Sequence, residues 1–250
     1  KPIVAAIKEV SSNLMAKRNS KHNPFLNMDM FILGGQLNNF TVKNYAFMLV
    51  KQGDKVYDPY NNFEETSVKF FLKKLTESQV EIGLHPNYNA HYKNTFNQQV
   101  STFKKIFNYS PSNVRNHYLR GEWPGFLISL EKQNVSDDFT FGFADSLLFR
   151  GGISRPFKLW NIKEQKPYNV VLHPLTIMEG TLMDYQKITL ETAIDTCAKK
   201  LQLAHKYGRE ITLLWHNRSM YKYGFENNFM PELFQGVKDE LETLNKNYGI

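Results

Sequence analysis

Apolar residues recur along the chain in two alternating patterns, which predict two kinds of secondary structure. Spacings of three and four residues, typical of amphipathic helices, occur over residues 63–78, 92–108, 190–206 and 231–246. Short continuous apolar runs, typical of buried strands, occur over residues 45–50, 80–84, 113–119, 169–175 and 211–217. Because strands that alternate with helices pair mostly in parallel through right-handed crossovers, this order predicts an α/β fold.

The remaining segments are shorter or less regular. Helical spacing also covers residues 3–17 and 25–37, and another short helix is predicted after Trp123. The segment FKLWNI, which follows a glycine-rich turn, predicts a further strand. Since no repeat, low-complexity tract or linker interrupts the pattern, we predict one domain over residues 1–250.

The composition is that of an ordinary globular protein. It excludes some classes of function and structure but identifies none. The chain has 250 residues, 42% of them hydrophobic and 22% charged, a size at which a single α/β barrel is common. Its formal net charge is +7, but the basic residues lie in scattered short pairs, so we expect no nucleic-acid partner. The single cysteine, Cys197, allows no disulfide within the chain and is interpreted as a small buried residue.

The same sequence shows no membrane or export signal. No apolar stretch approaches the ~20 residues that a spanning helix needs, so we predict no membrane span. No signal-peptide pattern is visible. The sequence begins at Lys1 without a methionine, and we interpret it as a fragment of a longer protein. The compartment stays open, with a slight preference for the cytoplasm, and nothing indicates the oligomeric state.

Three histidines each follow a predicted strand: His85 after VEIGL, His117 within NVRNHYL and His216 after ITLLW. In an α/β barrel the carboxyl ends of several strands meet at one mouth, where side chains carry out chemistry. The three imidazoles are therefore predicted to share one site, as metal ligands or as acids and bases. For each histidine alone, a hydrogen bond within its own loop is the alternative. The spacing gives no HxxxH pair, since Asn89 stands four residues after His85.

Other polar and aromatic residues extend this candidate site. Arg115 lies two positions before His117, so on a strand both would point to one face and could hold a carboxylate and a metal or substrate oxygen. A pair of Arg115 with an acidic residue, packed under a helix, is the alternative. Asp145 and Arg150 flank SLLF before two glycines, which indicates either a loop that approaches a polar ligand or a turn held by salt bridges. Trp215 would offer an apolar wall of the kind that binds sugar rings.

The order of the motifs GLHPNYN, RNHYLR, FTFGFADSLLFRGGISRPF, PLTIMEGTLMDY and LLWHN resembles the polysaccharide deacetylase-like family. These proteins are relatives of the NodB-type carbohydrate esterases, and this branch is common in bacterial surface-glycan gene clusters. The resemblance extends from Asn23 to about residue 245. It implies a distorted or incomplete (β/α) barrel, possibly without its first strand. It also implies a hydrolase that uses a divalent metal, zinc by preference, to remove N-acetyl groups from a glycan or sugar.

The resemblance also implies roles for individual residues. His85 matches a metal-binding histidine, and His117, a feature of this branch, is assigned as a second ligand. His216 matches the general acid of the terminal Leu-x-His motif. The other catalytic assignments are Arg115, which orients a catalytic aspartate, and Asp145 in the fourth motif. The assigned substrate-binding residues are Arg150, Glu179, Trp215 and Tyr88.

Two departures from the family pattern leave alternatives open. The family's first motif, a strand that ends in closely spaced aspartates, is not found and is expected upstream of Lys1. Asn89 replaces the second metal histidine. The chain is therefore either a deacetylase whose aspartate motif lies upstream or a catalytically inactive domain that binds carbohydrate through Trp215, Tyr88 and Trp123. A third alternative, binding of an anionic polymer, predicts an affinity that depends strongly on salt.

Overall fold

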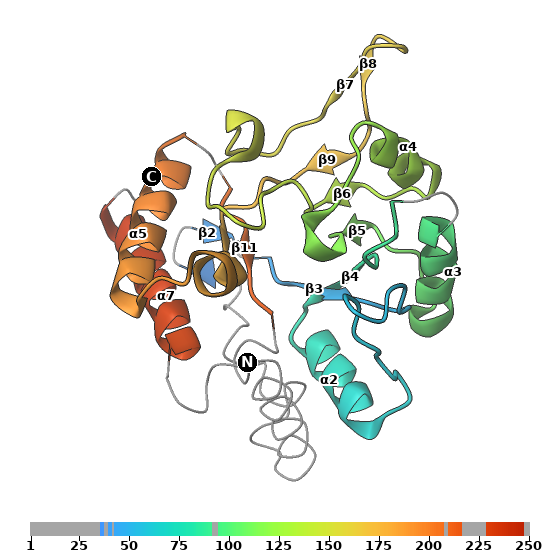
Figure 1. Cartoon of the computed structure of the whole chain (residues 1–250), viewed down its shortest axis with the longest axis horizontal. Helices are drawn as coiled ribbons and strands as arrows, with labels where there is room; N and C mark the ends of the chain where they lie inside the picture. The colour runs from blue at the N-terminus through green and yellow to red at the C-terminus, as the bar shows by residue number, and fades with distance from the viewer. Residues whose placement is uncertain are drawn as a thin grey trace.

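A five-stranded parallel sheet forms the centre of the protein in a computed structural model, which describes residues 36–37, 40–41, 43–91, 95–207, 210–216 and 229–247. The strand order is β3-β4-β5-β6-β9 (Figure 1). The strands are β3 (Tyr45–Met48), β4 (Glu81–Leu84), β5 (Asn113–Val114), β6 (Asp137–Asp138) and β9 (Val171–Leu172). All four pairings are parallel, as expected for strands separated by helices.

A second parallel pair extends this architecture. It consists of β10 (Ile177–Met178) and β11 (Leu213–Leu214). Because β10 follows β9 after four residues, one extended segment runs from the central sheet to β11. The predicted α/β fold with mostly parallel strands is confirmed, and its arrangement is compatible with a partial barrel.

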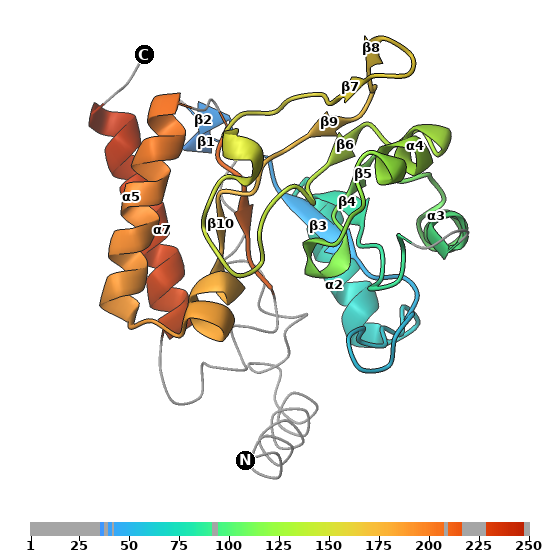
Figure 2. The ribbon, with the colours of Figure 1, turned by 45° about the horizontal axis from the view of Figure 1, so that its top comes forward.

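The helices cover the strands in two groups, each with one apolar face. Beside the five-stranded sheet lie α2 (Thr66–Glu77), α3 (Thr95–Phe107) and α4 (Gly125–Lys132) (Figure 1). On the other side, α5 (Leu190–Tyr207) and α7 (Phe229–Asn247) lie next to each other in both views (Figure 2). No helix in these ranges is long and apolar enough to cross a bilayer.

Each helix group encloses its own hydrophobic core. Phe103 of α3 and Leu127 of α4 are fully buried in a cluster with Val114 of β5. Leu201 of α5 and Leu233 of α7 are fully buried in a second cluster. Each such side chain contributes about 1.5–3 kcal/mol of hydrophobic stabilisation. The first core packs against the five-stranded sheet, and the second packs against the β10–β11 pair.

Two short antiparallel pairs complete the described fold, namely β1 (Gln36–Leu37) with β2 (Phe40–Thr41) and β7 (Trp160–Asn161) with β8 (Lys166–Pro167). The strand predicted at FKLWNI is therefore part of a hairpin outside the central sheet. The helix predicted over residues 3–17 lies outside the described residues, as does nearly all of the one over residues 25–37.

Candidate active site

His85 lies directly after β4, in the position predicted for it. Its backbone N–H donates to the carbonyl of Met48 on β3 (2.8 Å), and its Nδ1 contacts the carbonyl oxygen of Arg115. A carbonyl only accepts, so Nδ1 carries the proton and Nε2 keeps a free lone pair. Burial and the charge of His117 lower the pKa of His85 well below its ordinary value. The ring is therefore neutral at neutral pH, with Nε2 open to a ligand.

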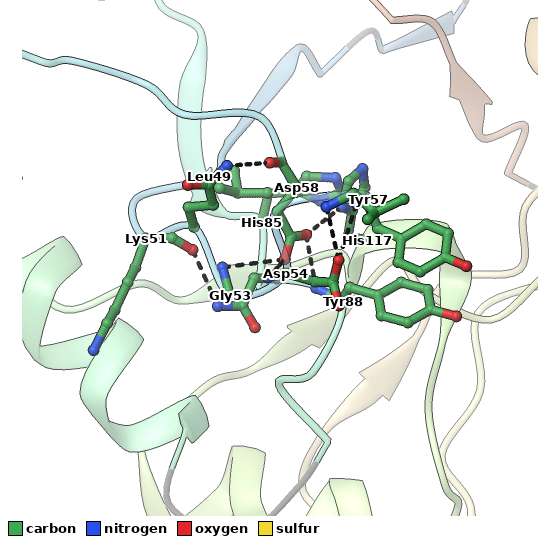
Figure 3. Close-up of polar contacts among 12 residues, drawn as sticks. Leu49, Lys51, Gly53, Asp54, Tyr57, Asp58, His85, Tyr88 and His117 are labelled. Carbon is green, nitrogen blue, oxygen red and sulfur yellow. Dashed lines mark hydrogen bonds and ion pairs between the residues drawn. The ribbon is translucent and has the colours of Figure 1, made fainter. Parts of the chain in front are cut away.

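His117 forms a pair with Asp58, a residue that was not predicted to belong to the site. Nδ1 of His117 lies 2.7 Å from Oδ1 of Asp58, which is only 3% exposed (Figure 3). The same oxygen accepts the N–H of Tyr88 (2.9 Å), and Oδ2 accepts the N–H groups of Gly53 (3.1 Å) and Asp54 (2.7 Å). Burial raises the pKa of Asp58, but these hydrogen bonds together lower it below its ordinary value. The carboxylate is ionised and orients the imidazole.

The loop that carries Asp58 is fixed against the segment after β4. Nδ2 of Asn87 donates to the carbonyl of Lys51 (3.0 Å), and the backbone of Gly53 lies directly beneath this side chain. A Cβ at Gly53 would lie 2.5 Å from that Nδ2. Only glycine permits this approach without displacing Asn87. The polar loop after β3 is thus an ordered wall of the site.

A strained turn places His117 away from the line of β5. The strand ends at Val114, and residues His117–Leu119 form a 3₁₀ turn in which Tyr118 (φ 58°) and Leu119 (φ 52°) are left-handed. Non-glycine residues in this region cost about 1–3 kcal/mol each, and they concentrate at functional sites. Arg115 and His117 both lie beyond β5 and are separated by the extended residue Asn116 (φ −67°, ψ 141°), so the strand predicted to carry them ends before either residue.

His216 and Glu179 form the third histidine pair. One carboxylate oxygen, Oε1 of Glu179, accepts both the backbone N–H (2.9 Å) and Nδ1 (2.7 Å) of His216. Glu179 is fully buried, whereas one third of the His216 side chain is exposed. Glu179 follows β10 and His216 follows β11, so the pairing of these strands brings them together. Glu179 was predicted to bind substrate, but its burial makes it a positioning residue.

The three predicted histidines share one arrangement. In each, Nδ1 faces an oxygen, from the carbonyl of Arg115 or from a carboxylate. The rings of His85 and His117 lie 5.0 Å apart, and the charges of His117 and His216 both act on the pKa of His85. Histidines that ligate metals almost always donate their second nitrogen in this way. This donor set fits a zinc-type ion, although no three His, Cys, Asp or Glu side chains within the described ranges already form a ligand cluster.

Arg115 supports this site from within the sheet. Its guanidinium lies over the rings of Phe47 (4.7 Å) and Phe139 (5.6 Å), and Nε donates to the carbonyl of Phe139 (3.2 Å). Burial lowers the pKa of Arg115 to about 10, against the charges of Asp138 and Glu179. Asp138, a second acid missed in the sequence, is fully buried, and burial raises its pKa to about 6. Arg115 is thus buried, within electrostatic range of two buried carboxylates.

Asp145 and Arg150 do not join the histidines. Asp145 is exposed, and no hydrogen bond or ion pair links its carboxylate to another residue of the described ranges. The guanidinium of Arg150 lies 4.6 Å from the ring centroid of Trp123 and close to two phenylalanines, Phe141 and Phe143. The loop is therefore held by cation–π contacts.

Trp215 and Tyr88 lie in different surroundings. Trp215 packs on Phe234 of α7, with ring centroids 5.3 Å apart, and belongs to the second core. It points away from His216 because neighbouring residues of an extended chain alternate in direction. Trp215 is thus part of the core, and the structure does not support its predicted role as a sugar wall. Tyr88 stacks on Tyr57 (4.1 Å) beside His117, where it is accessible to a ligand.

Comparisons with known proteins identify no family for this sequence. No model of a known protein family matches the sequence, and no curated protein matches it. The interpretation of the site therefore rests on its contacts and on the resemblance of its motifs.

Proposed function

We propose that this protein is a metal-dependent hydrolase that removes N-acetyl groups from a glycan or sugar, built on an incomplete barrel of the polysaccharide deacetylase type. The grouping of His85, His117 and His216, each with Nδ1 at hydrogen-bond distance from an oxygen, is the observation that carries this proposal. The three histidines follow strands, and barrel enzymes react at the carboxyl ends of their strands, which supports a proposal of metal-ligand and acid–base chemistry at this end.

In this proposal, His85 and His117 hold a divalent metal, zinc by preference, through their Nε2 atoms. The bound ion supplies Lewis acidity toward an acetyl carbonyl and toward water. Asp58 fixes the tautomer of His117, and because four hydrogen bonds occupy its two oxygens, it serves as a positioning residue. Neutral His85 needs no proton loss before it binds the ion.

His216 is the proposed general acid. Its Nδ1 is held by buried Glu179, so that Nε2 can give a proton to the leaving amine. The carboxylate of Glu179 also stabilises the charged imidazolium before the transfer, as in other histidine–carboxylate pairs. The partial exposure of His216 gives a sugar amide access to this nitrogen.

The test is release of acetate from an N-acetylglucosamine hexasaccharide, with zinc added or removed by a chelator. We expect zinc-dependent release that His216→Ala abolishes while the circular dichroism spectrum stays unchanged. The matched control is His205→Ala on α5, which should keep activity. Unchanged acetate release in His216→Ala would exclude the proposed role of this histidine.

One observation favours a second candidate function, a carbohydrate-binding domain without turnover. Tyr57 and Tyr118 are exposed beside the histidines, at 41% and 39% of their surface. Stacking of sugar rings on such tyrosines needs no metal. In that case the hexasaccharide binds, but no acetate appears with zinc in excess, even in the full-length protein.

A further inference from the structure

Three tyrosines form a rim directly beside His117. The rings of Tyr57 and Tyr88 stack at 4.1 Å, and the ring of Tyr118 meets both at nearly right angles, 5.7 and 5.5 Å away. The ring of Tyr118 also lies 4.7 Å from that of His117. Tyr57 and Tyr118 are partly exposed, so this rim (Tyr57, Tyr88 and Tyr118) offers aromatic faces to a ligand at the site.

Arg120 adds a positive charge to the rim. Its guanidinium lies 3.8 Å from the centroid of Tyr88, and Nη2 donates to Nε2 of His91 (3.2 Å). Burial and the charge of Arg120 lower the pKa of His91, against the charge of Glu122, so the His91 ring is neutral and does not form an ion pair with Arg120. Within the described ranges, no carboxylate lies at ion-pair distance from Arg120. The guanidinium is half-buried and keeps donors for an anion.

The backbone holds these groups in place at a cost in strain. Tyr118 and Leu119 are both left-handed, and Nδ2 of Asn116 donates to the carbonyl of Arg120 (2.6 Å) across the turn. This turn delivers His117 to Asp58, Tyr118 to the other tyrosines and Arg120 to Tyr88. Strain that persists in such a turn is typical of ligand sites.

We propose that this rim binds an anionic sugar unit, a pyranose that carries a carboxylate or a phosphate, next to the N-acetylated unit at the histidines. The role as a neighbouring subsite rests on the function proposed above, whereas the binding preference does not. The tyrosine rings pack against the apolar face of the pyranose. Arg120 pairs with the anionic group through two N–H donors, which favours a planar carboxylate or a phosphate over a hydroxyl.

The test is isothermal titration calorimetry on the full chain with three disaccharides that end in N-acetylglucosamine. Their other unit is glucuronic acid, glucose 6-phosphate or glucose. We expect the two anionic disaccharides to bind at least about tenfold tighter than the neutral one. The tighter of the two identifies the anion as a carboxylate or a phosphate. Tyr118→Ala should weaken binding of all three.

Two variants isolate the charge. Arg120→Gln should remove the anionic preference, while Lys105→Gln on α3, which also loses one positive charge, should keep it. Should Arg120→Gln fail to fold, the wild-type preference must still shrink as sodium chloride is raised. Equal binding of neutral and anionic disaccharides, or a preference that survives Arg120→Gln, would overturn the proposal.

The result is separable from catalysis. His216→Ala should keep the anionic preference, because its side chain lies outside the rim. An intact preference without acetate release from the anionic disaccharides overturns the proposed hydrolase and leaves the anionic subsite standing. Acetate release together with equal binding of the neutral and anionic disaccharides overturns the anionic subsite and leaves the proposed hydrolase standing.

Discussion

Histidines pair with carboxylates in two regions of this protein, and in one of them a single ring bridges two carboxylates. In the active-site region, Nδ1 of His117 lies 2.7 Å from Asp58, and Nδ1 of His216 lies 2.7 Å from Glu179. In the other region, His173 uses both nitrogens. Its Nε2 lies 2.7 Å from Asp137 and its Nδ1 lies 2.6 Å from Glu210.

This difference sets the charge and the task of each ring. Burial lowers the pKa of His173, but its hydrogen bonds to Asp137 and Glu210 outweigh this and raise the pKa to about 9. The charged ring stacks on Phe139 (4.2 Å) and connects β6 and β9 to Glu210, three residues before β11. Burial and His117 instead lower the pKa of His85. Contact with two carboxylates, rather than a place after a strand, marks the structural histidine.

The largest expected effect comes from Glu179→Gln, which removes the charge that orients His216. A neutral amide no longer stabilises the imidazolium, and its NH₂ group can select the wrong tautomer. We expect kcat for acetate release to fall by about a hundredfold or more, the scale of a lost general acid. The comparison variant is Asp145→Asn, which changes an exposed acid in the same way and should keep turnover. A larger loss of kcat in Asp145→Asn than in Glu179→Gln would indicate that the loop of Asp145 carries the catalytic acid.

Asp58→Asn should have the next largest effect, on the affinity for metal. Partners that orient ligating histidines typically contribute 10–100-fold to affinity, and the amide cannot match four hydrogen bonds to a carboxylate. Competition with a chromogenic chelator measures the zinc affinity directly. Asp54→Asn in the same loop is the control, because the backbone of Asp54 rather than its carboxylate contacts Asp58. Equal zinc affinity in wild type and Asp58→Asn would contradict the pairing.

Much of the fold could be predicted from the sequence because apolar periodicity reports burial directly. Helices α2, α3, α5 and α7 and strands β3 and β4 lie where their patterns placed them. The strand predicted over residues 113–119 was too long, since the pattern does not show that Tyr118 and Leu119 are left-handed. Apolar spacing reports which side is buried but not where a backbone turns.

The candidate site was predictable only in part, for a related reason. His85, His117 and His216 stood out because each follows an apolar run. Asp58 lies within a polar loop, and its role depends on backbone N–H groups that come close only in the folded chain. An acidic residue in the loop after the first strand was the available signal. Trp215 was predicted to bind sugar because it is a tryptophan next to His216. In an extended chain, however, the side chains of neighbouring residues point in opposite directions.

A smaller effect, on stability rather than activity, is expected in the region of His173. The folded state binds the His173 proton more tightly than the unfolded state, whose ordinary pKa is 6.5. This contribution is complete below pH 6.5 and is lost as the pH rises through about 9. Since the ring and its partners are partly exposed, we expect a loss of about 1–2 kcal/mol.

Urea unfolding between pH 6 and 9.5 measures this loss. His173→Gln should remove the fall over that window and lower the stability below it, while acetate release at neutral pH is kept. The variant also leaves two carboxylates without their shared donor. A stability of the wild type that rises between pH 6.5 and 9 would show that His173 is not charged in the fold.

The smallest effect is expected for Trp215→Phe. This variant tests whether Trp215, the residue before His216, takes part in substrate binding. Trp215 packs on Phe234, and its buried Nε1 has no hydrogen-bond partner among the described residues. Phenylalanine keeps an aromatic contact and removes this unsatisfied donor, so the stability should change by less than about 1 kcal/mol. KM for the hexasaccharide should stay unchanged, whereas Tyr57→Ala should raise it. A rise in KM for Trp215→Phe alone would place the sugar against α7 instead of the tyrosine rim.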